Sequence, residues 1–337
     1  MILVKRISDK INSVSGLILN TSSDYLKQGT VISVSEDIAW VKEADIVLFN
    51  RFAGREVFDA ENQETLLLLK NEDIYLVNAN FIPYNYVLIN LHITEEELYQ
   101  RERQVNSDII KGLMVDTTYN PQNFVPRTGT VVLTPKELIY NNSEYTSWWD
   151  TDIEVQAGDE VYCSYFEILL ALGRLINPTL PEHETKPEYI VKDGYIHVFI
   201  KYNAIIFAKR QETIIPVNGF MLVEPLKEKI IITKIELTEA RKNNTSESFG
   251  RVAYIGKPLR AYKGIKTNDN GDIKTGDVVW FKPLSSINLE YLLCSTMGRQ
   301  YYYMQRLAII HSWSEGDYKN IDVRLDFSGK CIIKTNN

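Results

Sequence analysis

The sequence predicts a mainly β protein in which one unit of roughly a hundred residues, an ordinary domain size, occurs three times. The first observation is an acidic turn followed at once by apolar, β-branched and aromatic residues, a combination typical of a buried strand. The turn and its strand occur at Ala44-Asp45 before residues 46–49, at Gly158-Asp159 before 160–163, and at Gly276-Asp277 before 278–281. The first copy has alanine in the glycine position.

The second observation is that the same landmarks surround each turn in the same order. A Gly-x-Val strand start lies upstream, at Gly29, Gly129 and Gly250. A first strand precedes it, at residues 2–5, 86–89 and 220–225. Two short apolar runs close each unit, at 66–69 with 74–77, at 196–200 with 204–207, and at 301–304 with 307–310. This recurrence indicates one small β unit that was triplicated and then diverged.

The order of these elements resembles the GroES-type co-chaperonin family, whose fold is a small, partly open β-barrel. The first unit resembles it most in length, and the third resembles it most in motif. The third unit's motifs are Tyr254-Ile255-Gly256, the turn at 268–271, Gly276-Asp277 and the closing strand at 306–310. The resemblance covers about residues 1–78, 82–210 and 214–312. It implies three tandem GroES-like domains at 1–80, 81–212 and 213–312, followed by a C-terminal arm at 313–337.

Composition and charge agree with a multidomain globular protein. A chain of 337 residues is too long for one ordinary core, and a hydrophobic fraction of 45% argues against a disordered chain. A net charge of -7 provides no basic surface, so we expect no direct nucleic-acid binding. Cys163, Cys294 and Cys331 are few and widely spaced, which predicts a reducing compartment without disulfides or a metal motif.

From the sequence we expect neither a signal peptide nor a membrane span. The N-terminus enters a strand without a charged leader and a cleavage site, and no run approaches the ~20 apolar residues of a spanning helix. We therefore expect a cytoplasmic protein, or a virion protein assembled in a host cytoplasm, with no membrane partner.

The first unit has a long loop at residues 8–28 that contains a candidate docking segment. Gly16 is followed by Leu17, Ile18 and Leu19. In the co-chaperonin family the equivalent loop carries a glycine and three apolar residues that dock on the chaperonin ring, so the resemblance implies this role here. The alternative is that the three residues form a strand inside the barrel or against a neighbour. The hairpin expected after Val34 is reduced to residues 35–43.

The second unit carries a predicted helical insertion and a second apolar triplet. Thr94 and Glu97 have the spacing of a capping box, which predicts a short amphipathic helix running to about Ile109. Leu113, Met114 and Val115 then repeat the first unit's triplet after Gly112. This likeness supports the duplication and gives a second candidate docking segment.

Two further insertions follow in the second unit. Residues 140–149 are aromatic-rich, and Trp148 and Trp149 cannot both point into one core, so at least one is a candidate interface residue. Packing against the next domain is an equally good alternative. Residues 170–189 contain three prolines and predict an extended surface loop.

The third unit has a long loop at 227–249, with a polar stretch at 239–248. Its apolar triplet is interrupted by Glu236, so the docking role is not expected here. Beyond the barrel, polar residues alternate with Ile321, Val323, Leu325 and Phe327, and a turn at 328–330 allows residues 331–333 to return. This predicts a C-terminal β-hairpin whose apolar face needs a partner.

The sequence predicts no enzyme. The four histidines are isolated, and we find no phosphate loop, nucleophile elbow, zinc ligand pair or EF-hand loop. Medium-chain alcohol dehydrogenases also contain a GroES-like domain, but the dinucleotide-binding half that they require is missing. We therefore predict no catalytic, cofactor-binding or metal-binding residues.

Two non-enzymatic functions remain, and both make the protein part of a large oligomer. The favoured interpretation is a structural assembly protein, for example an auxiliary or capsid-decorating protein of a bacteriophage virion. The alternative is a tandem co-chaperonin that docks on a chaperonin ring through its apolar triplets. Three unlike modules per chain do not divide into a seven-fold ring, which favours the first. The candidate partner-binding residues are Leu17, Ile18, Leu19, Leu113, Met114, Val115, Trp148, Trp149, Ile321, Val323, Leu325 and Phe327.

Overall fold

The computed structural model shows a mainly β protein in two compact units. It describes residues 1–7, 26–101, 125–139, 151–173, 188–227, 245–259, 272–281, 293–319, 321–325 and 331–335. One unit comprises Met1–Tyr140 and Asp152–Glu212, and the other comprises Asn141–Thr151 and Thr213–Asn337. Within the described ranges, no helix is both long enough and apolar enough to cross a bilayer.

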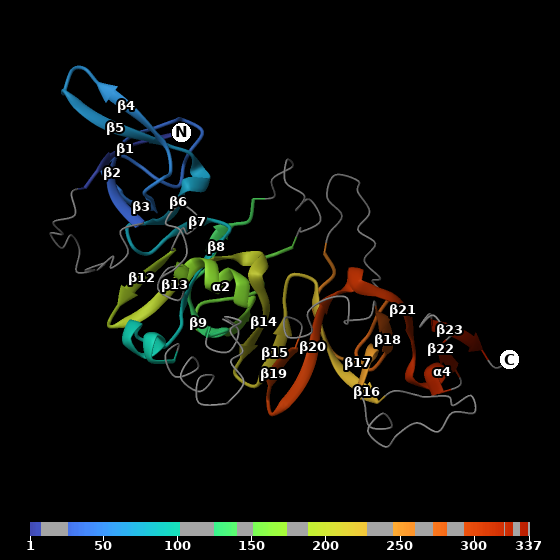
Figure 1. The fold of residues 1–337 in the computed structure, drawn as a ribbon. Helices are drawn as coiled ribbons and strands as arrows, with labels where there is room; N and C mark the ends of the chain where they lie inside the picture. The colour runs from blue at the N-terminus through green and yellow to red at the C-terminus, as the bar shows by residue number, and fades with distance from the viewer. Residues whose placement is uncertain are drawn as a thin grey trace. The chain divides into compact units, whose positions relative to one another are not determined.

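The first unit contains two antiparallel sheets (Figure 1). The strands of the first sheet have the order β4-β5-β1-β2-β3-β6. They are β1 (Ile2–Arg6), β2 (Leu26–Val34), β3 (Ile46–Asn50), β4 (Arg55–Asp59), β5 (Glu64–Leu69) and β6 (Ile74–Val77), with the 3-10 turn η1 (Asn71–Asp73) before β6. Strand β7 (Ile82–Tyr84) follows the first sheet in the chain, and β10 (Pro135–Glu137) lies in the part of the chain that forms the second sheet. The two strands form a short parallel pair.

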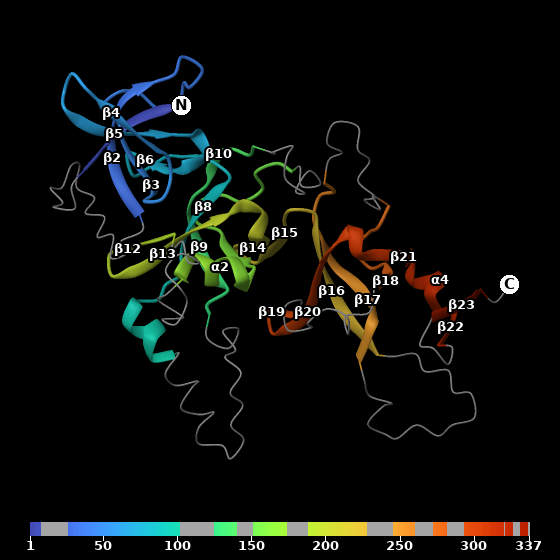
Figure 2. The ribbon, with the colours of Figure 1, turned by 45° about the horizontal axis from the view of Figure 1, so that its top comes forward.

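Within the first unit, the second sheet has the order β12-β13-β8-β9-β11-β14, and helix α2 packs against β13. Its elements are β8 (Tyr86–Asn90), β9 (Thr128–Leu133), β11 (Glu160–Cys163), α2 (Tyr165–Leu172), β12 (Tyr189–Lys192), β13 (Tyr195–Lys201), η5 (Tyr202–Ala204) and β14 (Ile205–Arg210). Figure 2 shows α2 lying across this sheet, and its residues Ile168 and Leu172 are completely buried. The chain then enters the other unit through β15 (Thr213–Pro216).

The second unit contains the third antiparallel sheet, with the order β19-β20-β16-β17-β18-β21. Its elements are β16 (Phe220–Lys227), β17 (Thr245–Ile255), β18 (Val278–Phe281), β19 (Leu293–Thr296), β20 (Arg299–Gln305), η8 (Arg306–Ala308) and β21 (Ile309–Trp313). The helix α4 (Glu315–Lys319) and the antiparallel pair β22 (Ile321–Leu325) and β23 (Cys331–Thr335) follow. The pairing of β22 with β23 confirms the C-terminal hairpin predicted from the sequence.

The acidic turn makes the same hydrogen bonds in all three sheets. Its aspartate carboxylate accepts a bond from the amide three residues earlier, at 2.9 Å from Lys42 to Asp45, 2.9 Å from Gln156 to Asp159 and 2.8 Å from Lys274 to Asp277. The residue before the aspartate has a left-handed backbone, with φ values of 69° at Ala44, 91° at Gly158 and 94° at Gly276. Glycine adopts this conformation without a Cβ penalty, which explains why two copies carry it.

The Gly-x-Val glycines occupy one crowded position in each sheet. A Cβ on Gly29 would lie 2.1 Å from Val4 Cγ1, and one on Gly250 would lie 2.2 Å from Val223 Cγ1. A Cβ on Gly129 would lie 2.5 Å from Ile89 Cγ2. Ladder irregularities also recur, between Leu3/Val4, Leu88/Ile89 and Leu222/Val223, and between Leu48/Phe49, Tyr162/Cys163 and Trp280/Phe281. Bulges of this kind bend a strand locally, so the three sheets curve at corresponding points.

The cores of the first and third sheets are filled from matching strand positions. The first core includes Ile2, Val4, Val31, Val47, Phe49, Leu67, Leu69 and Ile74. The third includes Met221, Val223, Val252, Val279, Phe281, Tyr302, Met304 and Ile309. Each buried side chain of this size contributes about 1.5–3 kcal/mol by leaving water, so these clusters stabilise their sheets.

The structure corrects the sequence analysis in three loops. The loop 8–28 was expected to reach Gln28, but β2 begins at Leu26, which pairs with Asn50. The segment 170–189 was expected to be a surface loop, but Leu170 to Leu172 belong to helix α2, because Tyr165, Ile168 and Leu172 recur at helical spacing and are buried. The loop 227–249 was expected to reach Phe249, but β17 begins at Thr245, which pairs with Lys227. In contrast, the predicted capping box is confirmed, since the Thr94 amide donates to Glu97 Oε2 at 2.9 Å and the Glu97 amide donates to Thr94 Oγ1 at 3.1 Å.

Candidate functional site

Most of the predicted partner-binding residues lie outside the described residues. This applies to the triplets Leu17, Ile18, Leu19 and Leu113, Met114, Val115, to the pair Trp148 and Trp149, and to Phe327. The backbone of Ile321, Val323 and Leu325 lies in strand β22 of the terminal hairpin. Their role in partner binding remains a prediction.

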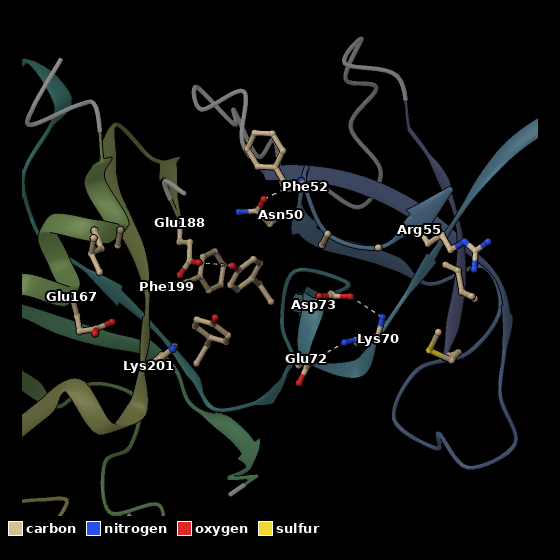
Figure 3. Close-up of a pocket in the computed structure, with 18 residues that line it drawn as sticks. Asn50, Phe52, Arg55, Lys70, Glu72, Asp73, Glu167, Glu188, Phe199 and Lys201 are labelled. Atoms are coloured by element: carbon tan, nitrogen blue, oxygen red, sulfur yellow. Dashed lines mark hydrogen bonds and ion pairs between the residues drawn. The ribbon is translucent and has the colours of Figure 1, made fainter. Parts of the chain in front are cut away.

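A cleft of about 840 Å³ lies in the first unit. It lies between the loop after β3, the turn η1 and β6 of the first sheet, and β8, α2 and β13 of the second. Figure 3 shows Lys70, Glu72 and Asp73 on one wall, with Glu188 and Phe199 on the other. The cleft is therefore built by residues that are distant in the sequence.

The floor of the cleft is a hydrogen-bonded aromatic group. The Tyr75 hydroxyl donates to Glu188 Oε1 at 2.6 Å, and these residues lie 113 positions apart in the chain. The Tyr86 ring meets the Tyr75 ring edge-on at 4.7 Å between centroids, and the Phe199 ring lies 5.4 Å from Tyr75. Leu48, Leu76 and Leu88 belong to the same buried cluster as Tyr75 and Phe199.

Burial and charge keep the two tyrosines protonated. Burial raises the pKa of Tyr75 far above its usual range, and the nearby Glu188 carboxylate raises that pKa further. Burial also raises the pKa of Tyr86, again with a contribution from Glu188. The hydroxyl of Tyr75 consequently acts as a hydrogen-bond donor to Glu188 at physiological pH, and the pair is a structural link between the two sheets.

The rim of the cleft combines charged groups with exposed apolar surface. Phe52 is 54% exposed and lies under the Arg51 guanidinium, 4.5 Å from its ring centroid. Lys70 pairs with Glu72 at 3.4 Å. Leu170 of α2 is 44% exposed on the opposite side. Exposed aromatic and aliphatic groups beside charges are typical of protein-binding surfaces.

The second unit has an aromatic cluster on its sheet. Phe249 is buried and lies near Trp280, Trp313 and Tyr318, with ring centroids 6.2, 6.3 and 6.2 Å away. Trp313 also meets the His311 ring at 4.4 Å. These contacts attach α4 to the sheet, because Tyr318 belongs to that helix.

Metal-ligating and thiol side chains are the remaining candidate reactive groups among the described residues. The described part of the chain contains no group of three or more histidine, cysteine, aspartate or glutamate side chains placed to hold a metal ion. Cys163 and Cys294 are buried, and burial raises the pKa of the Cys163 thiol well above its usual value. A buried thiol with a raised pKa is a poor nucleophile.

The sequence analysis missed the cleft. Tyr75 and Tyr86 lie in strands that were predicted, but their approach to Glu188 depends on how two sheets pack, which no local pattern encodes. Phe52 was also missed, although an exposed aromatic beside an arginine in a short loop is a signal that could have been noticed.

The chain was compared with known families and proteins. The family described as the chaperonin 10 kDa subunit matches residues 1–78. No curated protein matches the chain. The N-terminal domain is therefore GroES-like, which confirms the resemblance for the first of the three predicted units.

Proposed function

We propose that the protein is a non-enzymatic, co-chaperonin-like protein that docks on a chaperonin ring. The observation that carries this proposal is the family match over residues 1–78, which spans the loop with Gly16, Leu17, Ile18 and Leu19. The match favours a chaperonin ring as partner over the virion capsid that the sequence analysis preferred.

The proposal includes three tandem GroES-like modules on one chain. Three features support it: the common strand order, the repeated turn around Asp45, Asp159 and Asp277, and the crowded glycines at one strand position. Such agreement at the level of single hydrogen bonds and bulges is difficult to explain by unrelated sheets. Modules that keep the fold can differ in their loops, because loops tolerate insertions.

The docking role is assigned to the first two modules. Their loops carry the apolar triplets Leu17 to Leu19 and Leu113 to Val115, each after a glycine. The third module has Glu236 inside its triplet, so it serves as an architectural module. A ring partner would bury these apolar side chains, and each buried aliphatic side chain contributes about 1.5–3 kcal/mol.

The experiment is co-sedimentation of the purified protein with a chaperonin ring from the source cell, with and without ATP. The proposal expects ATP-dependent co-migration that is lost, or weakened at least tenfold, when Ile18 is changed to Ser. A tenfold loss corresponds to about 1.4 kcal/mol, within the value of one buried aliphatic side chain.

The matched control is Ile235→Ser, which makes the same change in the third module's interrupted triplet. Binding should be unaffected by this control. Absence of binding in ATP, or equal binding by the wild type and Ile18→Ser, would contradict the proposal.

A further inference from the structure

Within the described chain, strand β4 has an unpaired backbone edge and two exposed apolar side chains. It is the terminal strand of the first sheet, and among the described residues only β5 pairs with it. Val57 is 38% exposed and Phe58 is 62% exposed, and neither belongs to the core of this sheet. Figure 1 shows β4 and β5 as a hairpin at one end of the sheet. Exposed edges of this type are templates for pairing with another strand.

The terminal strand at the same position of the second sheet does not expose apolar side chains in this way. Strand β12 is the corresponding terminal strand, but its Tyr189 is 6% exposed and its Ile190 is 1% exposed. The β4 edge thus differs from its counterpart in the same unit, and the difference lies in its exposed side chains.

The sequence of β4 is complementary to itself in the antiparallel direction. The strand reads Arg55, Glu56, Val57, Phe58, Asp59. When two copies overlap along all five residues, Val57 faces Val57, and Arg55 of each copy faces Asp59 of the other. Opposite charges directly across an antiparallel pair stabilise it, and the diagonal approach of two Phe58 rings is within aromatic reach.

The charges needed for this register are available in the structure. Arg55 forms no ion pair with any other residue that the structure describes, and Figure 3 shows it at the far side of the cleft from Glu188. The Asp59 carboxylate accepts hydrogen bonds from the Asn62 side chain and from the backbone amides of Asn62 and Glu61. These hydrogen bonds hold the pKa of Asp59 below its usual range. These three bonds leave a lone pair on the carboxylate, which has about four acceptor sites.

We propose that β4 is a self-association edge, through which two copies of this chain pair antiparallel about a two-fold axis at Val57. The observation that carries the proposal is the self-complementary, exposed edge strand. A single pair of five-residue strands is a small interface, so the dimer is expected to be weak and concentration-dependent. The inference does not depend on chaperonin docking, because β4 and the residue 17–19 loop are different segments.

The first test is sedimentation of the full chain over a range of concentrations. Val57→Lys places two like charges opposite each other at the two-fold axis and should raise the dimer dissociation constant at least tenfold. The matched control is Tyr195→Lys, which adds the same charge at a 42% exposed strand position of the same unit and should change nothing. A monomeric wild type, or a dimer that persists in Val57→Lys, would overturn the proposal.

The second test reads the register directly by cross-linking and does not depend on the stability of the lysine variant. In a Cys331→Ser background, Val57→Cys should give a reducible dimer under mild oxidation, because residue 57 faces itself. Glu56→Cys, one position along the same strand, should cross-link at least several-fold more slowly, because residue 56 faces Phe58. Equal cross-linking at both positions would contradict this register.

Discussion

Ala44 has a left-handed backbone conformation, and glycine occupies the corresponding position in the other two sheets. Its φ is 69°, whereas Gly158 and Gly276 have 91° and 94°. A left-handed backbone costs an L-residue about 1–2 kcal/mol, and the extra flexibility of glycine in the unfolded chain offsets roughly half of this. The hydrogen bonds of the turn hold Ala44 in place, since its amide donates to the Val31 carbonyl at 2.9 Å.

Reciprocal substitutions at this turn should have opposite effects. We expect Ala44→Gly to raise the free energy of unfolding of the first unit by about 0.5–1 kcal/mol. Gly276→Ala should lower that of the second unit by a similar amount, and because an added Cβ would meet no other atom within 4 Å, strain in φ is the whole cause. Calorimetric unfolding would measure both shifts. Ala60→Gly, at an exposed residue without a positive φ, is the control and should be destabilising.

Tyr75 should make the stability of the first unit depend on pH in the alkaline range. Its folded pKa is raised above the unfolded value of about 10, first by burial and then by Glu188. The stability that it contributes is therefore complete below about pH 10 and is lost as the pH rises further, because the unfolded chain then releases the proton.

Tyr75→Phe should accordingly reduce stability by about 1–3 kcal/mol near pH 8, since Glu188 loses a buried donor. The difference from the wild type should narrow by up to about 1.4 kcal/mol per pH unit above pH 10. Urea unfolding of the wild type and Tyr75→Phe between about pH 8 and pH 11 measures how their difference in stability changes with pH. Tyr195→Phe, at a 42% exposed residue, is the control. A difference that stays constant over this range would refute the assignment.

At the scale of elements, the sequence predicted those strands and helix starts that a single clear residue pattern marks. The strands that line the cores were predicted because apolar residues such as Val47 and Phe49 follow a defined turn. The start of the inserted helix was predicted because Thr94 and Glu97 satisfy each other's backbone and side-chain groups.

The missed elements are those whose apolar content is low or whose partners are distant. Strand β4 has only Val57 and Phe58 between charged residues, so its pairing with β5 is set by the tight turn after Asp59. Helix α2 has only eight residues, and an apolar run of that length does not distinguish a helix from a strand. The parallel pair β7 and β10 depends on packing between two sheets.

The terminal hairpin gives an element-scale prediction. Strands β22 and β23 pair with each other and join no other sheet among the described residues. Removing residues 320–337 should weaken assembly, so that any native assembly contains fewer copies of the chain. The free energy of unfolding of each unit should stay within about 0.5 kcal/mol of its original value, as for surface changes outside a core. Sedimentation and calorimetry of the truncated protein measure the two effects. Unfolding of the three sheets would contradict this prediction.

At the scale of the whole molecule, the repeated order of landmarks predicted the three similar sheets. Each landmark has a physical reason in the structure: Gly29 and Gly250 avoid a clash, and Asp45 and Asp277 close the same turn. The partner could not be obtained in this way, because docking depends on a complementary surface that belongs to another molecule.

The most direct test of the account is the mass of the native particle that contains this chain in the source lysate. We expect it to sediment with a chaperonin ring in the presence of ATP and to separate from the ring when ATP is removed. Migration with a capsid-sized particle, unchanged by ATP, would contradict the co-chaperonin proposal and assign the GroES-like modules to architecture.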